Sequence, residues 1–154
     1  MTIRPATAND AKAIDKLAEQ FNRYLRHLGD TVEFHLTGET ILQDGFGDNP
    51  AFAGLVAEQH DIIVGYLLYH FGYDTDLAIR LLHVIDLYVD EDIRRQGVGK
   101  ELMTVAAKIC REAGGKQLFW SVFVQNKLAA SFYEMLGARY IRDLRFMIID
   151  ANSL

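Results

Sequence analysis

The most constraining feature of the sequence is a glycine-containing loop between a β-forming run and an amphipathic helix. Residues 80–89 are rich in aliphatic side chains, and residues 94–99 read Arg-Arg-Gln-Gly-Val-Gly. From about residue 98 to 113, apolar side chains recur at three- and four-residue spacing, which predicts a helix ended by Gly114-Gly115. Residues 117–124 favour another strand. This strand–helix–strand order predicts a right-handed parallel crossover.

Further strands and helices are predicted around this crossover. Periodic apolar residues predict a helix that begins near residue 10 and ends at Gly29. The other predicted elements are strands at 3–6, 52–58, 62–71 and 145–150 and helices at 37–43 and 126–136. His60-Asp61 and residues 72–76 separate consecutive strands, which indicates antiparallel hairpins. The expected fold is α/β: a mixed, mostly antiparallel sheet with one parallel βαβ crossover and helices on both faces, in a single domain of residues 1–154.

Composition narrows the classes of partner. The net charge of −5 argues against nucleic acid, because binding the phosphate backbone requires a basic face. No apolar run approaches the roughly 20 residues that span a bilayer, and the N-terminus lacks a signal-peptide pattern. Cys110 is the single cysteine, which excludes an intramolecular disulfide and fits a reducing compartment. We therefore expect a cytoplasmic protein with no membrane association.

The chemistry of the loop favours an anionic ligand. Gly97 and Gly99 permit close approach to the backbone, and the first turn of the following helix leaves N–H groups unpaired. These groups favour a pyrophosphate, and Arg94 and Arg95 add cationic side chains. The alternative is a tight turn with two solvated arginines. The sequence does not fit a Walker loop, which needs Gly-Lys-Ser/Thr, or a dinucleotide fingerprint, which needs a third glycine.

Further motifs downstream of the loop make the interpretation of its ligand more specific. The pattern Arg/Gln-x-x-Gly-x-Gly/Ala is met by residues 94–99, and it is followed by Asn126, Ser131-Phe132-Tyr133 and Leu136-Gly137-Ala138. In this order and separation, the motifs resemble the acetyl-CoA-binding core and closing segment of the GCN5-related N-acetyltransferase (GNAT) superfamily. The resemblance implies the acyl-CoA N-acyltransferase fold and acetyl-CoA as cosubstrate.

A narrower resemblance extends over nearly the whole chain. Residues 3–8, 42–47, 55–58 and 63–66 are similar to the diamine (spermidine/spermine) acetyltransferase family. That family implies a homodimer that acetylates primary amines of polyamines or related small molecules. The chain differs from the family in having Ile85-Asp86 where the family has Glu-Asp. It also has a stretch containing Arg26 and His27 where acidic residues are expected. The acceptor is therefore predicted as a primary amine of a small molecule, either a diamine or polyamine or a lysine-like amine, without specificity for polyamines.

The resemblance also implies a set of cofactor-binding residues from the strand end, the loop and the closing segment. These are Leu87, Tyr88, Val89, Arg94, Arg95, Gln96, Gly97, Val98, Gly99, Lys100, Asn126 and Tyr133. The backbone of residues 87–89 would pair with the pantetheine amides and stabilise the developing oxyanion. Leu87 and Val89 would also be core residues. Asn126 would hydrogen-bond the cofactor, cap its helix, or both.

Asp86 and His83 are the candidate bases. Either Asp86 accepts the proton of the amine, or it only hydrogen-bonds a distorted strand end. His83 is the second candidate, with a half-buried structural histidine as the alternative. In a regular strand these side chains face opposite sides, unless a bulge lies between them.

Tyr133 is the candidate proton donor to the departing thiolate, by its match to the family tyrosine. Its alternative role is packing beside Phe132. The five histidines show no metal-ligand spacing, and Cys110 is expected in the core. Residues 25–46 and 72–79 are expected to build the acceptor side. A GNAT enzyme with another acceptor (an amino acid, an amine antibiotic or a protein N-terminus) and a catalytically inactive acetyl-CoA-binding regulatory domain remain the alternatives.

Overall fold

The computed structural model describes residues 1–153, which form a five-stranded sheet in the order β1-β2-β3-β4-β5. Its strands are β1 (Thr2–Pro5), β2 (Ala53–Gln59), β3 (Ile62–Asp74), β4 (Ile79–Val89) and β5 (Gly115–Phe119). Its helices are α1 (Ala11–His27), α2 (Gly38–Phe46), α3 (Val98–Glu112) and α4 (Lys127–Met135), with short 3-10 turns η1 (Ala8–Asp10), η2 (Glu91–Ile93) and η3 (Ala151–Ser153).

The strand pairing confirms the predicted mixed sheet. Strands β1 to β4 pair antiparallel, whereas β4 and β5 pair parallel and are connected through α3. The β2–β3 hairpin turns at His60 and Asp61, whose φ angles of 51° and 62° are both left-handed. Two successive left-handed residues match the right-handed twist of a hairpin, which is why this dipeptide closes the turn.

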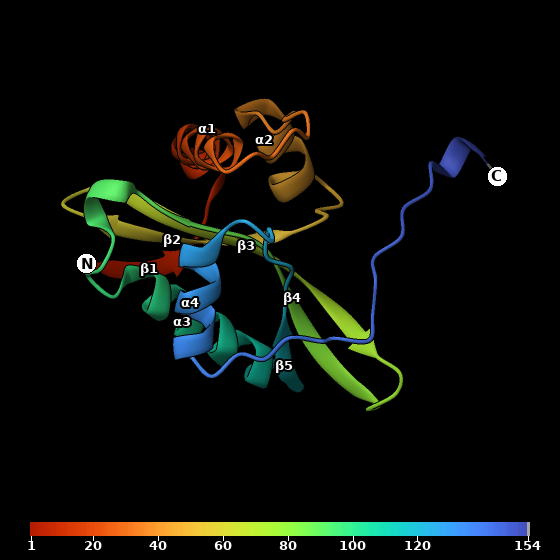
Figure 1. The fold of residues 1–154 in the computed structure, drawn as a ribbon. Coiled ribbons are helices and arrows are strands. Elements are labelled where there is room, and N and C mark those ends of the chain that lie inside the picture. The colour runs from red at the N-terminus through yellow and green to blue at the C-terminus, as the bar shows by residue number, and fades with distance from the viewer. Residues whose placement is uncertain (154) are drawn as a thin grey trace.

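Helices cover both faces of the sheet, as predicted (Figure 1). On one face, α1 and α2 pack over a core that includes Ile14, Ile41 and Tyr66. On the other face, α3 buries a stripe at four-residue spacing, made of Val98, Leu102, Ala106 and Cys110. Cys110 is 2% exposed, so it is a core residue as expected.

A β-bulge in β4 changes which residues face each core. Leu68 lies opposite Asp86, but the next residue, Tyr69, lies opposite Val84, so Ile85 is an extra residue in β4. Val84 belongs to the core under α3, whereas Asp86 reaches the side of the sheet covered by α1. A bulge also bends its strand and ends pairing locally. Consistently, the β4–β5 ladder stops at the pair His83–Phe119, just before the bulge.

Two predicted strands differ from the structure. The strand predicted at 117–124 is β5, but it ends at Phe119, because beyond the bulge β4 no longer offers it a partner. The strand predicted at 145–150 is wrong: residues 138–150 contain no strand, and the segment leaves the body of the molecule after α4 (Figure 1). A strand needs a hydrogen-bonded neighbouring backbone, and among residues 1–153 this segment pairs with none of the strands, although Phe146 lies 6.3 Å from Phe119 of β5 by ring centroids.

Other boundaries move by a few residues. Helix α2 continues to Phe46, beyond the predicted end at residue 43, because Phe46 packs against the core under α1.

Across residues 1–153, none of the helices combines the length and apolarity needed to cross a bilayer.

Candidate active site

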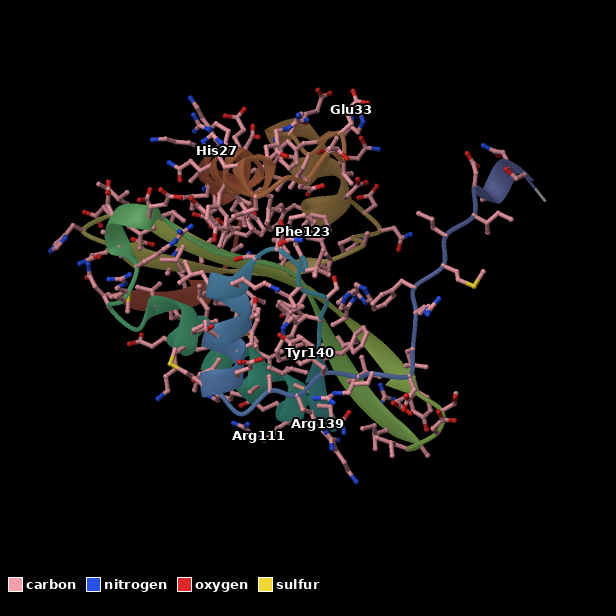
Figure 2. The ribbon with its side chains drawn as sticks, in the orientation of Figure 1. His27, Glu33, Arg111, Phe123, Arg139 and Tyr140 are labelled. Carbon is pink, nitrogen blue, oxygen red and sulfur yellow. The ribbon has the colours of Figure 1, made fainter. Side chains whose placement is uncertain are left out.

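A cavity opens where β4 and β5 separate. Its volume is about 330 Å³, and it lies between β4, α1 and the chain that leads from β5 into α4. Figure 2 shows Phe123 on that connecting chain, on the side toward α1 and α2. The lining residues are Phe21, Leu25, Val84, Ile85, Asp86, Leu87, Trp120, Ser121, Val122, Phe123, Asn126, Ala129 and Tyr133. Four residues predicted from sequence therefore meet at one cavity: Asp86, Leu87, Asn126 and Tyr133.

Asp86 lies on the cavity wall with its carboxylate held by a buried phenol. The Tyr66 hydroxyl donates a hydrogen bond of 3.0 Å to Oδ2 of Asp86. Burial raises the pKa of Asp86 from 3.8 to about 6, although the Tyr66 hydrogen bond acts in the opposite direction. At neutral pH the carboxylate is ionised, and a pKa near 6 makes it a much better proton acceptor than an exposed aspartate.

Tyr133 lines the cavity and packs against aromatic rings at the same time. Its ring centroid lies 4.8 Å from that of Trp120 and 5.1 Å from that of Phe132. Burial, and then the charge of Asp86, raise the pKa of Tyr133 to about 12. The phenol therefore stays protonated at neutral pH, as a proton donor must. Tyr133 therefore packs against Trp120 and Phe132 and also lines the cavity.

His83 lies apart from these residues. The bulge does turn His83 and Asp86 to the same side of β4, but His83 is not among the residues that line the cavity. Its Nδ1 lies 2.8 Å from Nε2 of His70 on the neighbouring strand. Burial and the neighbouring His70 lower the pKa of His83. The surroundings of His83 thus match the half-buried structural histidine of the alternative interpretation.

The glycine loop contains two residues with a left-handed backbone conformation. Arg95 and Gly97 have φ angles of 65° and 86°, both left-handed, and α3 begins immediately afterwards at Val98. The start of α3 leaves its first backbone N–H groups unpaired beside these residues. Gly97 has open space where a side chain would stand, so a ligand can approach it.

Gly99 also has a packing role. A Cβ added there would lie 3.2 Å from Cζ of Phe132 on α4. The missing side chain at Gly99 therefore lets α3 and α4 approach each other, and so positions the helix that carries Tyr133.

Arg94 is engaged by the protein itself. Its guanidinium carbon lies 5.0 Å from the ring centroid of Tyr24 and 5.2 Å from that of Tyr88, and its Nε donates to the carbonyl of Val89 at 3.1 Å. These contacts hold α1 against the end of β4. The exposed side chains around the loop are those of Arg95, Gln96 and Lys100.

Asn126 is the N-cap of α4. Its Oδ1 accepts hydrogen bonds from the backbone N–H of Ala129 at 3.2 Å and from the hydroxyl of Tyr24 at 3.1 Å. The capping role is confirmed, and a link from α4 to α1 is added. Tyr24 was not predicted from the sequence: its spacing after Phe21 places it at the edge of the apolar stripe, but no local pattern indicates its polar partner.

The backbone of β4 offers a free edge at the cavity. Asp90 donates its N–H to the carbonyl of Val64 across the pair Gly65–Val89. In an antiparallel ladder, this pattern turns the polar groups of Val89, and by alternation those of Leu87, away from β3. They face the side where β5 has left the sheet. The Val89 carbonyl already accepts from Arg94, whereas Leu87 lines the cavity.

These features fit acetyl-CoA. A pantetheine arm can extend the sheet along the free edge at Leu87, and a pyrophosphate can bind the N–H groups from Arg95 into α3. The acetyl end would then lie in the cavity beside Asp86 and Tyr133. Within residues 1–153, no cluster of His, Cys, Asp and Glu side chains offers a metal site.

Comparisons with known proteins agree with this geometry. Residues 14–138 match the model of the acetyltransferase (GNAT) family. The chain is 34% identical over 145 residues to a thialysine N-epsilon-acetyltransferase from Sus scrofa, covering 89% of this chain and 83% of that protein. It is 30% identical over 143 residues to spermidine/spermine N(1)-acetyltransferase-like protein 1 from Homo sapiens, covering 88% of this chain but 20% of that longer protein.

The fold is shared with solved structures of lower sequence identity. A ribosomal-protein-alanine N-acetyltransferase from Brucella melitensis biovar Abortus 2308 superposes with a TM-score of 0.77 at 18% identity, covering 96% of this chain and 99% of that one. The family match, the relatives and the fold lead to one conclusion. The chain belongs to the GNAT family of acetyltransferases and is an acetyl-CoA-dependent N-acetyltransferase.

Proposed function

We propose that this enzyme acetylates a primary amine of a small molecule, either a diamine or polyamine or a lysine-like amine, by direct attack in a ternary complex. Acetyl-CoA supplies the acetyl group as a thioester whose carbonyl the amine attacks. Asp86 acts as general base and Tyr133 as general acid. The proposal rests above all on one observation: these two side chains line the same cavity at the free edge of β4.

A general base is needed because the amine must lose a proton before it can attack. A primary amine with a pKa of ~10.4 is protonated at pH 7, and freeing its lone pair costs roughly 4.6 kcal/mol. Asp86, with a pKa of about 6, accepts this proton on its carboxylate. The backbone N–H of Leu87 faces the free edge, where it stabilises the negative charge that develops on the carbonyl oxygen.

A smaller cavity supports the acceptor side of the proposal. Its volume is about 130 Å³, and it shares Phe21, Leu25 and Asp86 with the larger one. Asp30 and Glu33, from the loop after α1, also line it. Their carboxylates favour a cationic amine there. Asp86 thus lies between the cavity that suits the acetyl end and the one that suits the amine.

The activity is tested by following free thiol release from acetyl-CoA with polyamines, lysine analogues including thialysine, amino acids and aminoglycosides. We expect turnover with a diamine, a polyamine or a lysine analogue, and none with the same acceptor after its primary amines are fully methylated. Turnover only with amino acids or aminoglycosides would assign a different acceptor. Acetyl-CoA binding without turnover on any amine would instead indicate a regulatory domain.

We also propose that the enzyme is a homodimer in which residues 140–149 pack against a second copy. Phe146, Met147 and Ile148 are 79–100% exposed, although an apolar run of this kind is normally covered in a soluble protein. Consecutive apolar residues suit a strand that is covered on both faces. Strand β5 is the last strand of the sheet and offers a free edge for such pairing.

The dimer is tested by sedimentation of the full chain and of a variant with Phe146, Met147 and Ile148 changed to Ser. We expect a dimer for the full chain and a monomer for the variant. A Leu77→Ser change, at an exposed apolar position in the β3–β4 turn, is the control and should leave the dimer intact. A monomeric wild-type chain at micromolar concentration contradicts the proposal.

A further inference from the structure

The β4 bulge and a buried phenol together determine where the carboxylate of Asp86 lies. Tyr66 is at the centre of β3, opposite Tyr88, and its side chain is 0% exposed. It belongs to the core under α1, and its hydroxyl donates to Oδ2 of Asp86. Without the extra residue Ile85, alternation would turn Asp86 toward α3 and away from Tyr66.

Burial of the Tyr66 hydroxyl is energetically unfavourable unless the hydroxyl makes a hydrogen bond. An unpaired hydroxyl in an apolar core is strongly unfavourable, and a phenylalanine of nearly the same shape would fill this space without that cost. The hydrogen bond that the structure gives this hydroxyl is the one to Asp86. A tyrosine at this position is therefore accounted for by the carboxylate rather than by packing.

The second carboxylate oxygen of Asp86 remains available to accept a proton. Among residues 1–153, Oδ1 of Asp86 makes no hydrogen bond. It is also absent from the fully buried polar atoms that lack a hydrogen-bond partner, so it is open to the cavities. With Oδ2 held by the Tyr66 hydroxyl, Oδ1 is the carboxylate oxygen that remains to accept a proton. Asp86 lines both cavities, so one anchored oxygen suits a base that works between them.

We propose that Tyr66 is a positioning residue that anchors one oxygen of Asp86 and keeps this carboxylate in its ionised, proton-accepting form. The inference rests on the proposed role of Asp86 as base. A hydrogen bond to the ionised form favours that form, and here it opposes the effect of burial on the pKa of Asp86. The other ionisable groups around this carboxylate are Tyr133 on α4 and Asp30 and Glu33 across the smaller cavity.

The test is Tyr66→Phe, which removes only the hydroxyl. We expect the pKa of Asp86 to rise by about one unit, the usual effect of losing a hydrogen bond to a charged group. Two readouts follow it: the ¹³C-carboxyl NMR titration of Asp86, and the acid limb of kcat/KM for the amine. Both midpoints should move upward together, while the KM for acetyl-CoA stays within about twofold.

Matched variants separate this role from packing. Tyr69→Phe removes the hydroxyl of the neighbouring tyrosine of β3, which packs against the other core, and it should leave both midpoints unchanged. In an Asp86→Asn background, Tyr66→Phe should cause no further change in the pH profile. If Tyr66→Phe does not fold, site-specific 3-fluorotyrosine at position 66 keeps the shape with a stronger donor and should lower both midpoints.

Unchanged NMR midpoints in Tyr66→Phe and in the fluorinated protein would overturn the inference. The failure of the proposed function looks different. If the NMR midpoint moves in Tyr66→Phe while the kinetic acid limb does not, Tyr66 holds Asp86 as inferred, but Asp86 is not the base.

Discussion

Tyr133→Phe is expected to lower kcat by about 10²- to 10⁴-fold, the range associated with loss of a positioned general acid. The phenol has a pKa of about 12, so its proton is present throughout the working pH range. Without it, the thiolate has to leave unprotonated or take a proton from water. The ring of Phe can still pack between Trp120 and Phe132, so the fold of α4 should persist.

Binding and leaving-group measurements define the role further. The Kd for acetyl-CoA should stay within about threefold of wild type, because the loss acts on the transition state. An acetyl thioester of a more acidic thiol needs less help to depart, so the variant should lose less rate with it. Tyr69→Phe, which removes the phenol hydroxyl of a β3 residue that packs against the core under α3, is the matched control. A kcat within about threefold of wild type, or an equal loss of acetyl-CoA affinity, would show that Tyr133 is not the acid.

The parts of the site that follow from local sequence were predicted well. The apolar stripe of α3, the glycine-containing turn before it and the cap at Asn126 depend on residues within a turn or two of each other. Such interactions leave a periodic or positional signature in one stretch of chain. The crossover of β4, α3 and β5 followed from the same local signals.

What the sequence did not predict depends on contacts between distant segments. The bulge at Ile85 exists only relative to the register of β3, and Tyr66 lies 20 residues away from the carboxylate that it holds. Asp86 and His83 were predicted as alternative bases that face the same side of the strand only if a bulge lies between them. The bulge is present, but His83 pairs with His70 outside the cavity.

The predicted strand at 145–150 failed for a related reason. Its residues have strong β propensity, but propensity does not supply the neighbouring backbone that a strand requires. Similarly, the link from Tyr24 to Asn126 joins residues 102 positions apart, which no local pattern in one sequence can indicate. The helix that carries Tyr133 is therefore held by contacts that only the folded chain shows.

Asp86→Asn is expected to lower kcat/KM for the amine by about 10²-fold or more at neutral pH and to remove the acid limb of the pH profile. In the wild type, kcat/KM should fall about tenfold per pH unit below about pH 6, as the carboxylate becomes protonated. The amide cannot accept a proton at any of these pH values. The remaining pH dependence of the variant should come only from the amine itself.

The stability of the same variant gives an independent check on the sign of the pKa shift. The folded-state pKa of Asp86 is raised from 3.8 to about 6. The carboxyl therefore destabilises the folded state most when it is ionised, above pH 6. The asparagine never ionises and can still accept from Tyr66. Relative to wild type, Asp86→Asn should therefore gain stability between pH 4 and pH 7, by up to about 3 kcal/mol.

Urea unfolding at several pH values measures this gain, with Asp92→Asn as a control that removes an equal charge at an exposed site. If Asp86 only holds the strand end, its replacement should lower the stability of the protein. Loss of activity together with a gain of stability would therefore indicate a catalytic role rather than a structural one. An Asp86→Asn enzyme that is destabilised at pH 7, or that keeps the acid limb, would therefore contradict the assignment of Asp86 as the base.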